Sequence, residues 1–269
     1  MKKFDIIVMA GQSNAAGCGW GPVTEEYIPD ERIWQYTNNI GIRVTGTGSD
    51  LKAEPILPTQ ERWGVAEEKT VETHKVGNLA LQFAASYADK CLQPDRKVLL
   101  VQANCGGTGY ARQQWGVGNF MHTNMLEMVK KALAGDPGNR VVALLWHQGE
   151  HDAFENADWD AQKRYEVHKA NLQATLADFY RQVGDKDIPF IAGDFCYEWR
   201  QKNQDACDAV AKAIRECAQA FGGGFVETVG LLSNNQKNGN GDDIHFCRES
   251  LHILGQRYFE KYMSIMENK

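Results

Sequence analysis

Four short polar segments carry the side chains that could do chemistry, and each lies where an apolar run ends or a helical stretch begins. The first is residues 11–14, Gly-Gln-Ser-Asn, which place Ser13 at a glycine-flanked turn. A serine in such a turn exposes its hydroxyl as a nucleophile and leaves its backbone amide free to bind an anion. A helix N-cap serine fits the same residues. The Gly-x-Ser-x-Gly pattern of α/β-hydrolases is excluded, because position 15 is alanine.

Groups that can bind a developing negative charge lie in two further segments. Residues 104–109, Asn-Cys-Gly-Gly-Thr-Gly, contain the adjacent glycines Gly106 and Gly107. Such glycines let the backbone approach a ligand closely and present its N–H groups, although a tight turn has the same composition. In residues 146–152, Trp-His-Gln-Gly-Glu-His-Asp, the Gln148 side chain can donate its amide hydrogens to an oxyanion.

The segment after the third apolar run also fits a zinc pattern. Residues 147–151, His-Gln-Gly-Glu-His, match the H-x-x-E-H pattern of metalloproteases, which requires a helix to bring both histidines to one face. Here the pattern directly follows the apolar run 141–145 and contains Gly149, which weakens a helix. We therefore expect no metal, and a zinc-dependent hydrolase using His147 and His151 is kept as the alternative.

Residues 242–246, Asp-Asp-Ile-His-Phe, combine a carboxylate with an imidazole. An aspartate and a histidine three residues apart can fold so that the carboxylate fixes the ring tautomer and leaves the other ring nitrogen to act as a base. Taken alone, Asp242 and His245 fit a surface pair better. Together, the four segments supply a nucleophile, amide donors, a side-chain donor and an oriented base, which are the parts of an acyl-transfer site.

The elements that must position these segments alternate along the chain. Apolar runs without a polar face are typical of parallel strands covered on both sides. The clear runs are 4–10, 97–103, 140–146 and 188–193, and the weaker ones are 32–36 and 224–229. Between them, apolar residues recur every four positions as single helical stripes: Leu79, Phe83 and Tyr87; Leu172, Leu176 and Tyr180; Leu254, Tyr258 and Tyr262. The alternation predicts an α/β fold, a three-layer α/β/α sandwich with right-handed βαβ units.

In such a sheet, ligands bind beyond the carboxyl ends of the strands, which is where the polar segments fall. The polar stretch 37–76 is expected to run over the surface and to form part of a substrate cleft. No linker or repeat divides the sequence, so we expect a single domain over residues 1–269.

Composition limits the partners and the location. The chain has 269 residues, 43% of them hydrophobic and 24% charged, with a net charge of -6. It has no basic tract and no apolar run of about 20 residues, so we expect neither a nucleic-acid partner nor a membrane span. Seven cysteines without Cys-x-x-Cys spacing indicate reduced thiols, and Cys18 and Cys105 are expected to be buried structural thiols. Because Asp5 interrupts the first apolar run, we expect a cytoplasmic protein, or a secreted one if a leader was removed.

These motifs resemble the SGNH-hydrolase superfamily, and within it the branch of sialate O-acetylesterase-like and acetylxylan-esterase-like carbohydrate esterases. The likeness is carried by the four polar segments together with residues 54–56 and 76–84, and it spans nearly the whole chain. It implies a flavodoxin-like fold with a mainly parallel five-stranded sheet. It also implies a serine esterase without a cofactor that removes O-acetyl groups from carbohydrates (acetylated xylan, sialic acid or related sugars) through an acetyl-enzyme intermediate. His151 departs from this branch, which more often has a small residue there.

The resemblance also implies a role for individual residues. Ser13 matches the nucleophile, His245 the general base and Asp242 its orienter. The oxyanion would be held by the amide of Ser13, the amide of Gly107 (Gly106 as the alternative) and the Gln148 side chain. Apart from the resemblance, the candidate substrate contacts are residues in or near the loops at the presumed strand ends: Gln12, Asn14, Glu150, Trp20, Trp63, Tyr110 and Trp115. Flat apolar rings suit the C–H faces of sugars, although core packing explains aromatic residues equally well.

Two classes of protein without hydrolase activity are weighed against an esterase. A carbohydrate-binding module would bind an acetylated ligand in the same cleft and release no acetate. A flavodoxin-like nucleotide binder would need a phosphate cradle after the first strand, and residues 11–14 lack both the Gly-x-Gly-x-x-Gly and the P-loop spacing. Neither class explains Asp242 together with His245. The partner that the resemblance implies is an acetylated carbohydrate, and the oligomeric state is left open.

Overall fold

A computed structural model describes residues 3–25, 27–28, 30–37, 54–55 and 76–269, which are built around one mainly parallel sheet. The strands lie in the order β4 (Glu54–Pro55), β3 (Ile33–Thr37), β6 (Arg96–Asn104), β1 (Lys3–Gly11), β7 (Arg140–His147), β8 (Phe190–Gly193) and β9 (Gly224–Val226). All neighbouring pairs from β3 to β9 are parallel, and β4 pairs with β3 in the antiparallel direction. A separate two-stranded sheet joins β2 (Gly19–Trp20) to β5 (Val76–Gly77).

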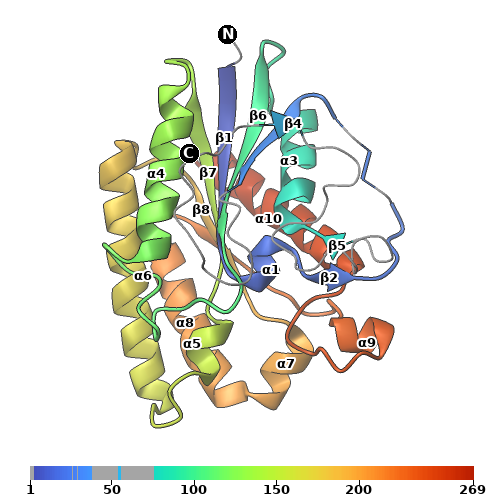
Figure 1. Ribbon diagram of the computed structural model, residues 1–269, viewed down its shortest axis with the longest axis vertical. Helices are drawn as coiled ribbons and strands as arrows, with labels where there is room; N and C mark the ends of the chain where they lie inside the picture. The colour runs from blue at the N-terminus through green and yellow to red at the C-terminus, as the bar shows by residue number, and fades with distance from the viewer. Residues whose placement is uncertain (1–2, 26, 29, 38–53, 56–75) are drawn as a thin grey trace.

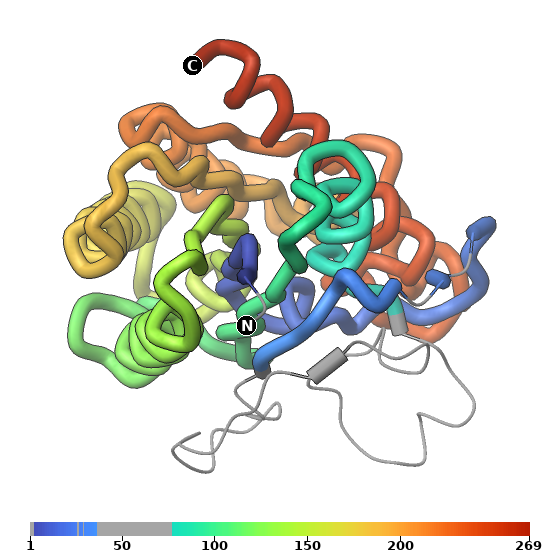
Figure 2. The backbone as a smooth tube through the Cα atoms, turned by 90° about the horizontal axis from the view of Figure 1, so that it is seen from above, coloured from blue at the N-terminus to red at the C-terminus, as the bar shows by residue number. Residues whose placement is uncertain are grey.

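Helices cover both faces of the sheet, which confirms the α/β/α sandwich (Figure 1). One layer contains α3 (Leu79–Lys90) and α10 (Arg248–Glu267), and the other contains α4 (Phe120–Ala134), α6 (Ala161–Val183) and α8 (Gln204–Ala220). Seen from above, α4 and α6 lie on one side of the strands and α3 on the other (Figure 2). The apolar stripes predicted within α3, α6 and α10 are buried throughout, because they are the faces that pack into the core.

The predicted number of five strands is wrong. Both weaker runs form strands, since 32–36 contains most of β3 and 224–229 contains β9, so six strands are parallel and the short β4 adds a seventh. β3 and β9 are short and lie towards the two edges of the sheet. They therefore do not need the long continuous apolar run that marks the central strands β1, β6 and β7.

The charged residue that interrupts the first apolar run has its partners at the amino end of the sheet. Asp5 is fully buried and accepts hydrogen bonds from Arg96 Nε at 2.7 Å, Arg140 Nε at 2.6 Å and the Tyr87 hydroxyl at 2.8 Å. Burial alone would raise the pKa of Asp5, but the hydrogen bonds from Arg140 and Tyr87 hold this pKa below its ordinary value. Asp5 lies at the start of β1, so this cluster stabilises the fold and takes no part in the site at the other end of the strand.

Strand register brings three of the four polar segments together. Gly11 at the carboxyl end of β1 pairs with Asn104 at the end of β6 and with His147 at the end of β7. The segments that follow these strands therefore leave the sheet side by side, as the rule for open α/β sheets predicts.

Some expectations about organisation are only partly covered by the structure. Most of the stretch 37–76 lies outside the described residues, so its expected place in the cleft, and a single domain over residues 1–269, stay predictions. None of the helices in the described part of the chain has the length and apolar character that crossing a membrane requires.

Candidate active site

A sharp turn at the end of β1 presents Ser13. Gly11 has φ 145°, and a Cβ at this position would lie 2.1 Å from the backbone oxygen of His147, so only glycine fits between the strand ends. The Gln12 N–H donates to that same oxygen at 3.0 Å. The chain then turns into α1 (Ser13–Ala16), of which Ser13 is the first residue. The Ser13 N–H therefore lies ahead of the helical hydrogen-bond pattern, at the end of a helix that favours negative charge.

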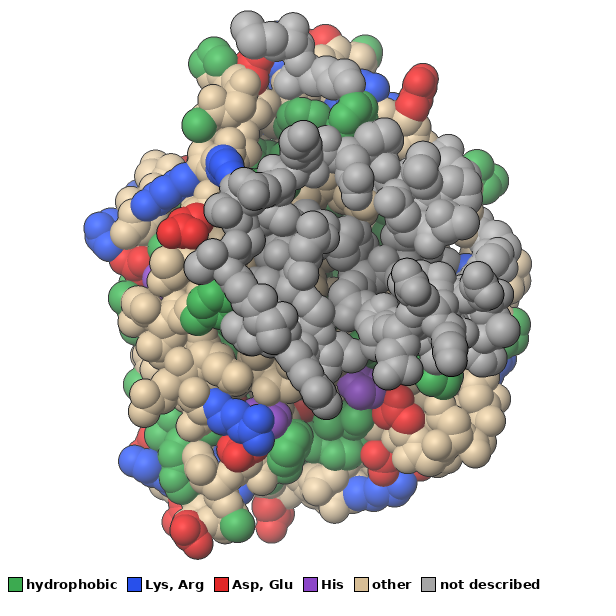
Figure 3. Space-filling view, in the orientation of Figure 1, with side chains coloured by type: hydrophobic (Ala, Val, Ile, Leu, Met, Phe, Trp, Pro, Cys, Tyr) green, Lys and Arg blue, Asp and Glu red, His purple; other side chains and the backbone are tan. Residues whose placement is uncertain are grey.

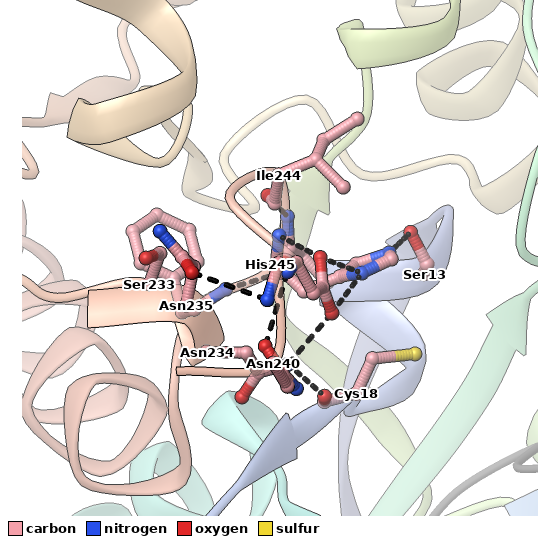
Figure 4. A network of polar contacts seen from close by, with 12 residues as sticks. Ser13, Cys18, Ser233, Asn234, Asn235, Asn240, Ile244 and His245 are labelled. Atoms are coloured by element: carbon pink, nitrogen blue, oxygen red, sulfur yellow. Dashed lines mark hydrogen bonds and ion pairs between the residues drawn. The ribbon is translucent and has the colours of Figure 1, made fainter. Parts of the chain in front are cut away.

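His245 and Ser13, which are 232 positions apart in the sequence, meet at this turn. His245 Nε2 lies 2.8 Å from Ser13 Oγ, and His245 Nδ1 lies 2.9 Å from each carboxylate oxygen of Asp242. Figure 4 shows the Ser13 hydroxyl and the His245 ring pointing toward one another. With Nδ1–H donating to the carboxylate, Nε2 can accept the hydroxyl proton, which is the geometry of a nucleophile, a base and an orienting carboxylate. The catalytic roles of the three residues stay predictions.

The loop that carries Asp242 and His245 is fastened to α9 (Asn234–Asn238). Asn234 Nδ2 donates to Asp242 Oδ2 at 2.9 Å, and the Asn235 N–H donates to the Asp242 carbonyl at 2.7 Å. Burial alone would raise the pKa of Asp242, but the hydrogen bonds from His245 and Asn234 hold this pKa below its ordinary value. The carboxylate therefore stays ionised at neutral pH. Asn234 contacts the site and was not predicted from the sequence, because an Asn- and Gly-rich stretch carries no signal of which amide faces the site.

The neighbouring carboxylate, Asp243, points elsewhere. It forms an ion pair with Lys202 at 2.7 Å on the exposed side of the loop. Of the two adjacent aspartates, Asp242 is thus the one that contacts the imidazole, as the motif match predicts.

Asn14 and Glu150 form a buried hydrogen-bonded pair, here called the buried bracket, and Asn14 binds the loop that carries His245. Both side chains are fully buried, and Asn14 Nδ2 donates to Glu150 Oε1 at 2.8 Å. Asn14 also donates to the carbonyl of Ile244 at 3.2 Å and accepts from the N–H of Phe246 at 3.2 Å. It therefore holds the chain on both sides of the imidazole. Asn14 and Glu150 are thus engaged in the interior, and their predicted contact with substrate stays a prediction that this burial does not support.

Replacing Asn14 with alanine is expected to lower the free energy of unfolding by about 2–4 kcal/mol, because it removes hydrogen bonds to a buried carboxylate and to two backbone groups. Urea unfolding followed by circular dichroism measures this change. The control is Asn171→Ala, since Asn171 is half-buried on α6 and its side chain donates to the carbonyl of Val167 within the same helix. A loss no greater than that of the control would contradict the proposed bracket.

The groups predicted to bind an oxyanion lie beside the turn, with one difference from expectation. Gly107 is exposed and has φ 70°, whereas Gly106 is buried, so Gly107 is the more accessible amide. Gln148 Nε2 donates to Asp152 Oδ2 at 2.9 Å and to the Thr108 carbonyl at 3.2 Å. Both amide hydrogens of Gln148 are thus bound to protein oxygens, and donation to an oxyanion requires one of them to leave its partner. The oxyanion roles stay predictions.

The zinc alternative loses its geometric basis. His147 is the last residue of β7, whereas His151 lies in α5 (Glu150–Phe154), so the two rings do not share one helix face. His147 Nδ1 lies 3.0 Å from the Tyr258 hydroxyl, and His151 Nε2 lies 2.9 Å from Glu155 Oε2. Across the described residues, no group of three or more His, Cys, Asp or Glu side chains is arranged to hold a metal ion.

Most of the predicted aromatic contacts are core residues. Tyr110 and Trp115 are buried against Trp146, and their polar atoms bond Thr175 Oγ1 and Thr108 Oγ1 respectively. They were predicted as sugar contacts because they follow a strand, but the loop folds back and packs them beneath the site. Trp20 is partly exposed in β2, and Trp63 lies outside the described residues.

Gln12 is also an interior residue, and its Oε1 accepts from the His151 N–H at 3.3 Å. Its contact with substrate stays a prediction that this burial does not support, because the turn at Ser13 directs the neighbouring side chain inward. This contact also gives His151 a place in the structure, since it ties α5 to the turn of Ser13.

Other aromatic residues are exposed near α5 and α7 (Tyr197–Lys202). The side chains of Phe154 and Tyr197 reach solvent, and the Phe154 ring packs edge-on against His151 with 4.7 Å between centroids. On the face shown in Figure 3, histidine side chains reach the surface and hydrophobic side chains lie between them. Nothing in the sequence indicated that Phe154 and Tyr197 would be exposed, because neither belongs to a repeating apolar pattern.

The two thiols near the site are held in their protonated form. Burial raises the pKa of Cys18 to about 12, with a further contribution from Asp242 and Glu150, and burial raises the pKa of Cys105 to about 11. Nucleophilic cysteines have lowered pKa values, so neither thiol is prepared to act as a nucleophile. Cys105 is buried as expected, whereas Cys18 is only half-buried.

A mainly parallel α/β sheet with a serine, a histidine and an aspartate in contact at its carboxyl edge is the architecture of the SGNH-hydrolase fold. Residues 3–264 match the family described as carbohydrate esterase, sialic acid-specific acetylesterase. The chain belongs to this family, and it is a carboxylic-ester hydrolase of carbohydrates.

Individual relatives agree with this assignment. The chain is 22% identical over 237 residues (77% of this chain, 72% of the relative) to a probable 9-O-acetyl-N-acetylneuraminic acid deacetylase of Escherichia coli K12. It is 23% identical over 276 residues (96% of this chain, 90% of the relative) to a probable carbohydrate esterase of Arabidopsis thaliana. The crystal structure of NanS superposes with a TM-score of 0.78 at 17% identity, covering 100% of this chain and 99% of the other, which shows a shared fold.

Proposed function

We propose that the protein is a serine esterase that removes O-acetyl groups from sugars through an acetyl-enzyme, with Ser13 as the nucleophile. The observation that carries this proposal is the 2.8 Å separation of Ser13 Oγ and His245 Nε2, with Asp242 on the opposite ring nitrogen. A carbohydrate-binding module has no need for a hydroxyl, an imidazole and a carboxylate in this order. The arrangement supports turnover because Asp242 orients the His245 ring, and the ring can then accept the proton of the Ser13 hydroxyl.

In the first half of the reaction, Ser13 Oγ attacks the acetyl carbonyl carbon while His245 Nε2 takes the hydroxyl proton. The resulting tetrahedral oxyanion collapses, the bond to the sugar oxygen breaks, and His245 returns its proton to that oxygen. In the second half, His245 takes a proton from water and the hydroxide attacks the acetyl group on Ser13. The bond between the acetyl carbon and Ser13 Oγ then breaks, acetate leaves, and His245 returns its proton to Ser13 Oγ. Asp242 keeps the ring in the required tautomer and stabilises the imidazolium in both halves.

The oxyanion is assigned to the backbone amides of Ser13 and Gly107 and to the side chain of Gln148. Gln148 reaches this role when one of its N–H groups exchanges the longer bond, 3.2 Å to the Thr108 carbonyl, for a bond to the oxyanion. Its other N–H remains on Asp152. Each such donor is worth about 10²–10³-fold in kcat, so the three groups supply a large share of the rate enhancement.

The preferred substrate is assigned to an O-acetylated sialic acid, because the family description names sialic acid and the relative in Escherichia coli is named for an acetylated neuraminic acid. Trp20, which is partly exposed in β2 beside the Asn234 side chain, is a candidate contact for the sugar. No nucleic acid, membrane or cofactor enters this proposal. The expected cytoplasmic location stays a prediction.

Acetate release from a panel of acetylated sugars tests this assignment. We expect an O-acetylated sialic acid to give the highest kcat/KM, with lower values for acetylated xylan and for peracetylated neutral monosaccharides. A chelator is expected to leave every rate unchanged, because no step uses a metal. Binding of the acetylated sialic acid without acetate release would favour a binding module, and activity that disappears with the chelator and returns with zinc would favour the metal alternative. A preference for acetylated xylan would replace the substrate and leave the serine mechanism in place.

A further inference from the structure

Asp152 is a buried carboxylate beside the site that the proposed mechanism does not use. Its side chain accepts hydrogen bonds from three groups, which are the backbone of Ala111, the amide of Gln148 and the ring of His168. These donors come from three segments of the chain: the loop after β6, the end of β7 and helix α6. A buried carboxylate costs free energy unless it is hydrogen-bonded, so the fold maintains all three contacts at once.

One oxygen of Asp152 holds the glycine loop that follows β6. The Ala111 N–H donates to Asp152 Oδ1 at 2.8 Å. Gly109 approaches so closely that a Cβ there would lie 2.5 Å from the same oxygen, so the loop packs directly against the carboxylate. Gly107, whose amide is assigned to the oxyanion, is two residues from this contact. Asp152 therefore fixes where the loop lies relative to α5.

The other oxygen determines the orientation of the Gln148 amide. Gln148 Nε2 lies between Asp152 Oδ2 and the Thr108 carbonyl, whereas Gln148 Oε1 has no hydrogen-bond partner among the described residues. Both neighbours of Nε2 can only accept hydrogen bonds, so a rotation of the amide by 180° would place oxygen against oxygen. The carboxylate thus keeps the N–H groups, and not the carbonyl, on the side of the glycine loop.

His168 holds Asp152 in turn. Its Nδ1 lies 3.0 Å from Asp152 Oδ2, and its fully buried ring packs edge-on against Tyr110 at 5.1 Å. Burial alone would raise the pKa of Asp152, but the hydrogen bond from His168 holds this pKa below its ordinary value. The carboxylate therefore stays ionised and keeps the capacity to accept from all three donors.

We propose that Asp152, held by His168, is a positioning residue for the groups that bind the oxyanion. This inference rests on the proposed function, because it requires Gln148 and the Gly107 loop to take that role. Asp152 stands to Gln148 as Asp242 stands to His245, since each carboxylate orients a side chain that touches the reacting atoms. The oxyanion forms only after attack, so the loss of Asp152 affects kcat more than KM.

A double-mutant cycle between Asp152 and Gln148 tests the inference, with kcat and KM measured on an aryl acetate. We expect Gln148→Ala to lower kcat by about 10²–10³-fold, and Asp152→Asn to lower it by about 10–100-fold while KM changes less than about threefold. In the Gln148→Ala background, Asp152→Asn is expected to cost less than about fivefold, because the side chain that it positions is gone and the asparagine oxygen can still accept from the Ala111 N–H that holds the loop. Equal losses in the two backgrounds, or a loss confined to KM, would overturn the inference.

A second variant keeps the test decisive if Asp152→Asn does not fold, as judged by near-UV circular dichroism. His168→Gln leaves the carboxylate in place and is expected to lower kcat by about three- to tenfold, a loss that also disappears in the Gln148→Ala background. A loss that persists there would count against the inference.

The matched control is His122→Gln, since His122 is another buried histidine, on α4, that faces Asp178 at 3.4 Å. This control is expected to keep kcat within about twofold of the wild type, because the change lies outside the site. Activity retained by Ser13→Ala would reject the proposed function itself, whereas an inactive Ser13→Ala together with additive losses in the cycle would reject only the role of Asp152.

Discussion

Replacing Ser13 with alanine is expected to lower kcat for acetate release by at least about 10⁴-fold. The reason is that the Ser13 hydroxyl is the atom proposed to carry the acetyl group, and His245 Nε2, 2.8 Å away, has no other hydroxyl in contact with it among the described residues. The residual rate would come from the oxyanion donors and from substrate binding. Single-turnover acetate release from an aryl acetate, measured at saturating enzyme, separates this residual rate from contamination by wild type.

The change at Ser13 should leave the fold intact, because it removes one oxygen atom from a side chain whose hydroxyl contacts only the imidazole in the described structure. Equal unfolding midpoints in urea and unchanged near-UV circular dichroism would establish this. Labelling of the wild type with an organophosphonate, detected as a mass increase on the peptide containing Ser13, provides a readout that does not depend on turnover. Substantial activity in Ser13→Ala, or labelling of the wild type at another residue, would contradict the proposed role of Ser13 as the nucleophile.

The second large effect is expected for Asp242→Asn, which should lower kcat by about 10³–10⁴-fold. An asparagine amide can donate to His245 Nδ1, and the ring would then carry its proton on Nε2. In that tautomer Nε2 faces Ser13 with a hydrogen and cannot accept the hydroxyl proton. Measurement of kcat for both an aryl acetate and an acetylated sugar checks this, since the defect lies in the base and should appear with either substrate.

Asp243→Asn is the matched control, because it makes the same chemical change one position along the chain. Asp243 contacts Lys202 on the exposed side of the loop and not the imidazole. Its substitution should keep kcat within about twofold of the wild type, since exposed ion pairs contribute little. Similar losses at both positions would mean that the loop as a whole, and not the Asp242 contact with the ring, is what the reaction requires.

The place of the polar segments in the fold could be predicted from the sequence more completely than the packing of individual side chains. The turn at Ser13, the paired glycines, Gln148 and the Asp242–His245 spacing were all identified as reactive segments, and each lies at the predicted edge of the sheet. The predicted positions are correct because an apolar run indicates a buried strand, and the polar residues that follow it lie at the carboxyl end of that strand. The family resemblance added a role for each residue. The spacing of the motifs alone fits either a catalytic site or ordinary turns.

Predictions that depended on burial of individual side chains were less successful. Asn14, Glu150, Tyr110 and Trp115 lie next to reactive segments in the sequence, and all four are buried. A residue in a loop can turn inward or outward, and the direction is set by what packs above it. Asp152 lies within the polar segment 146–152, which marks it as a residue near the site. Its three hydrogen-bond donors come from positions 111, 148 and 168, so the sequence does not show that it holds Gln148.

The sequence by itself determined the kinds of groups available, the alternation of strands and helices, and the edge of the sheet where those groups gather. Only the tertiary structure decided that the hydroxyl of Ser13 and the ring of His245 lie 2.8 Å apart, that Asn234 holds Asp242, and that Gln148 is held by Asp152. The physical reason is that periodicity reports local burial, whereas a contact between distant segments depends on strand register and on packing summed over many side chains.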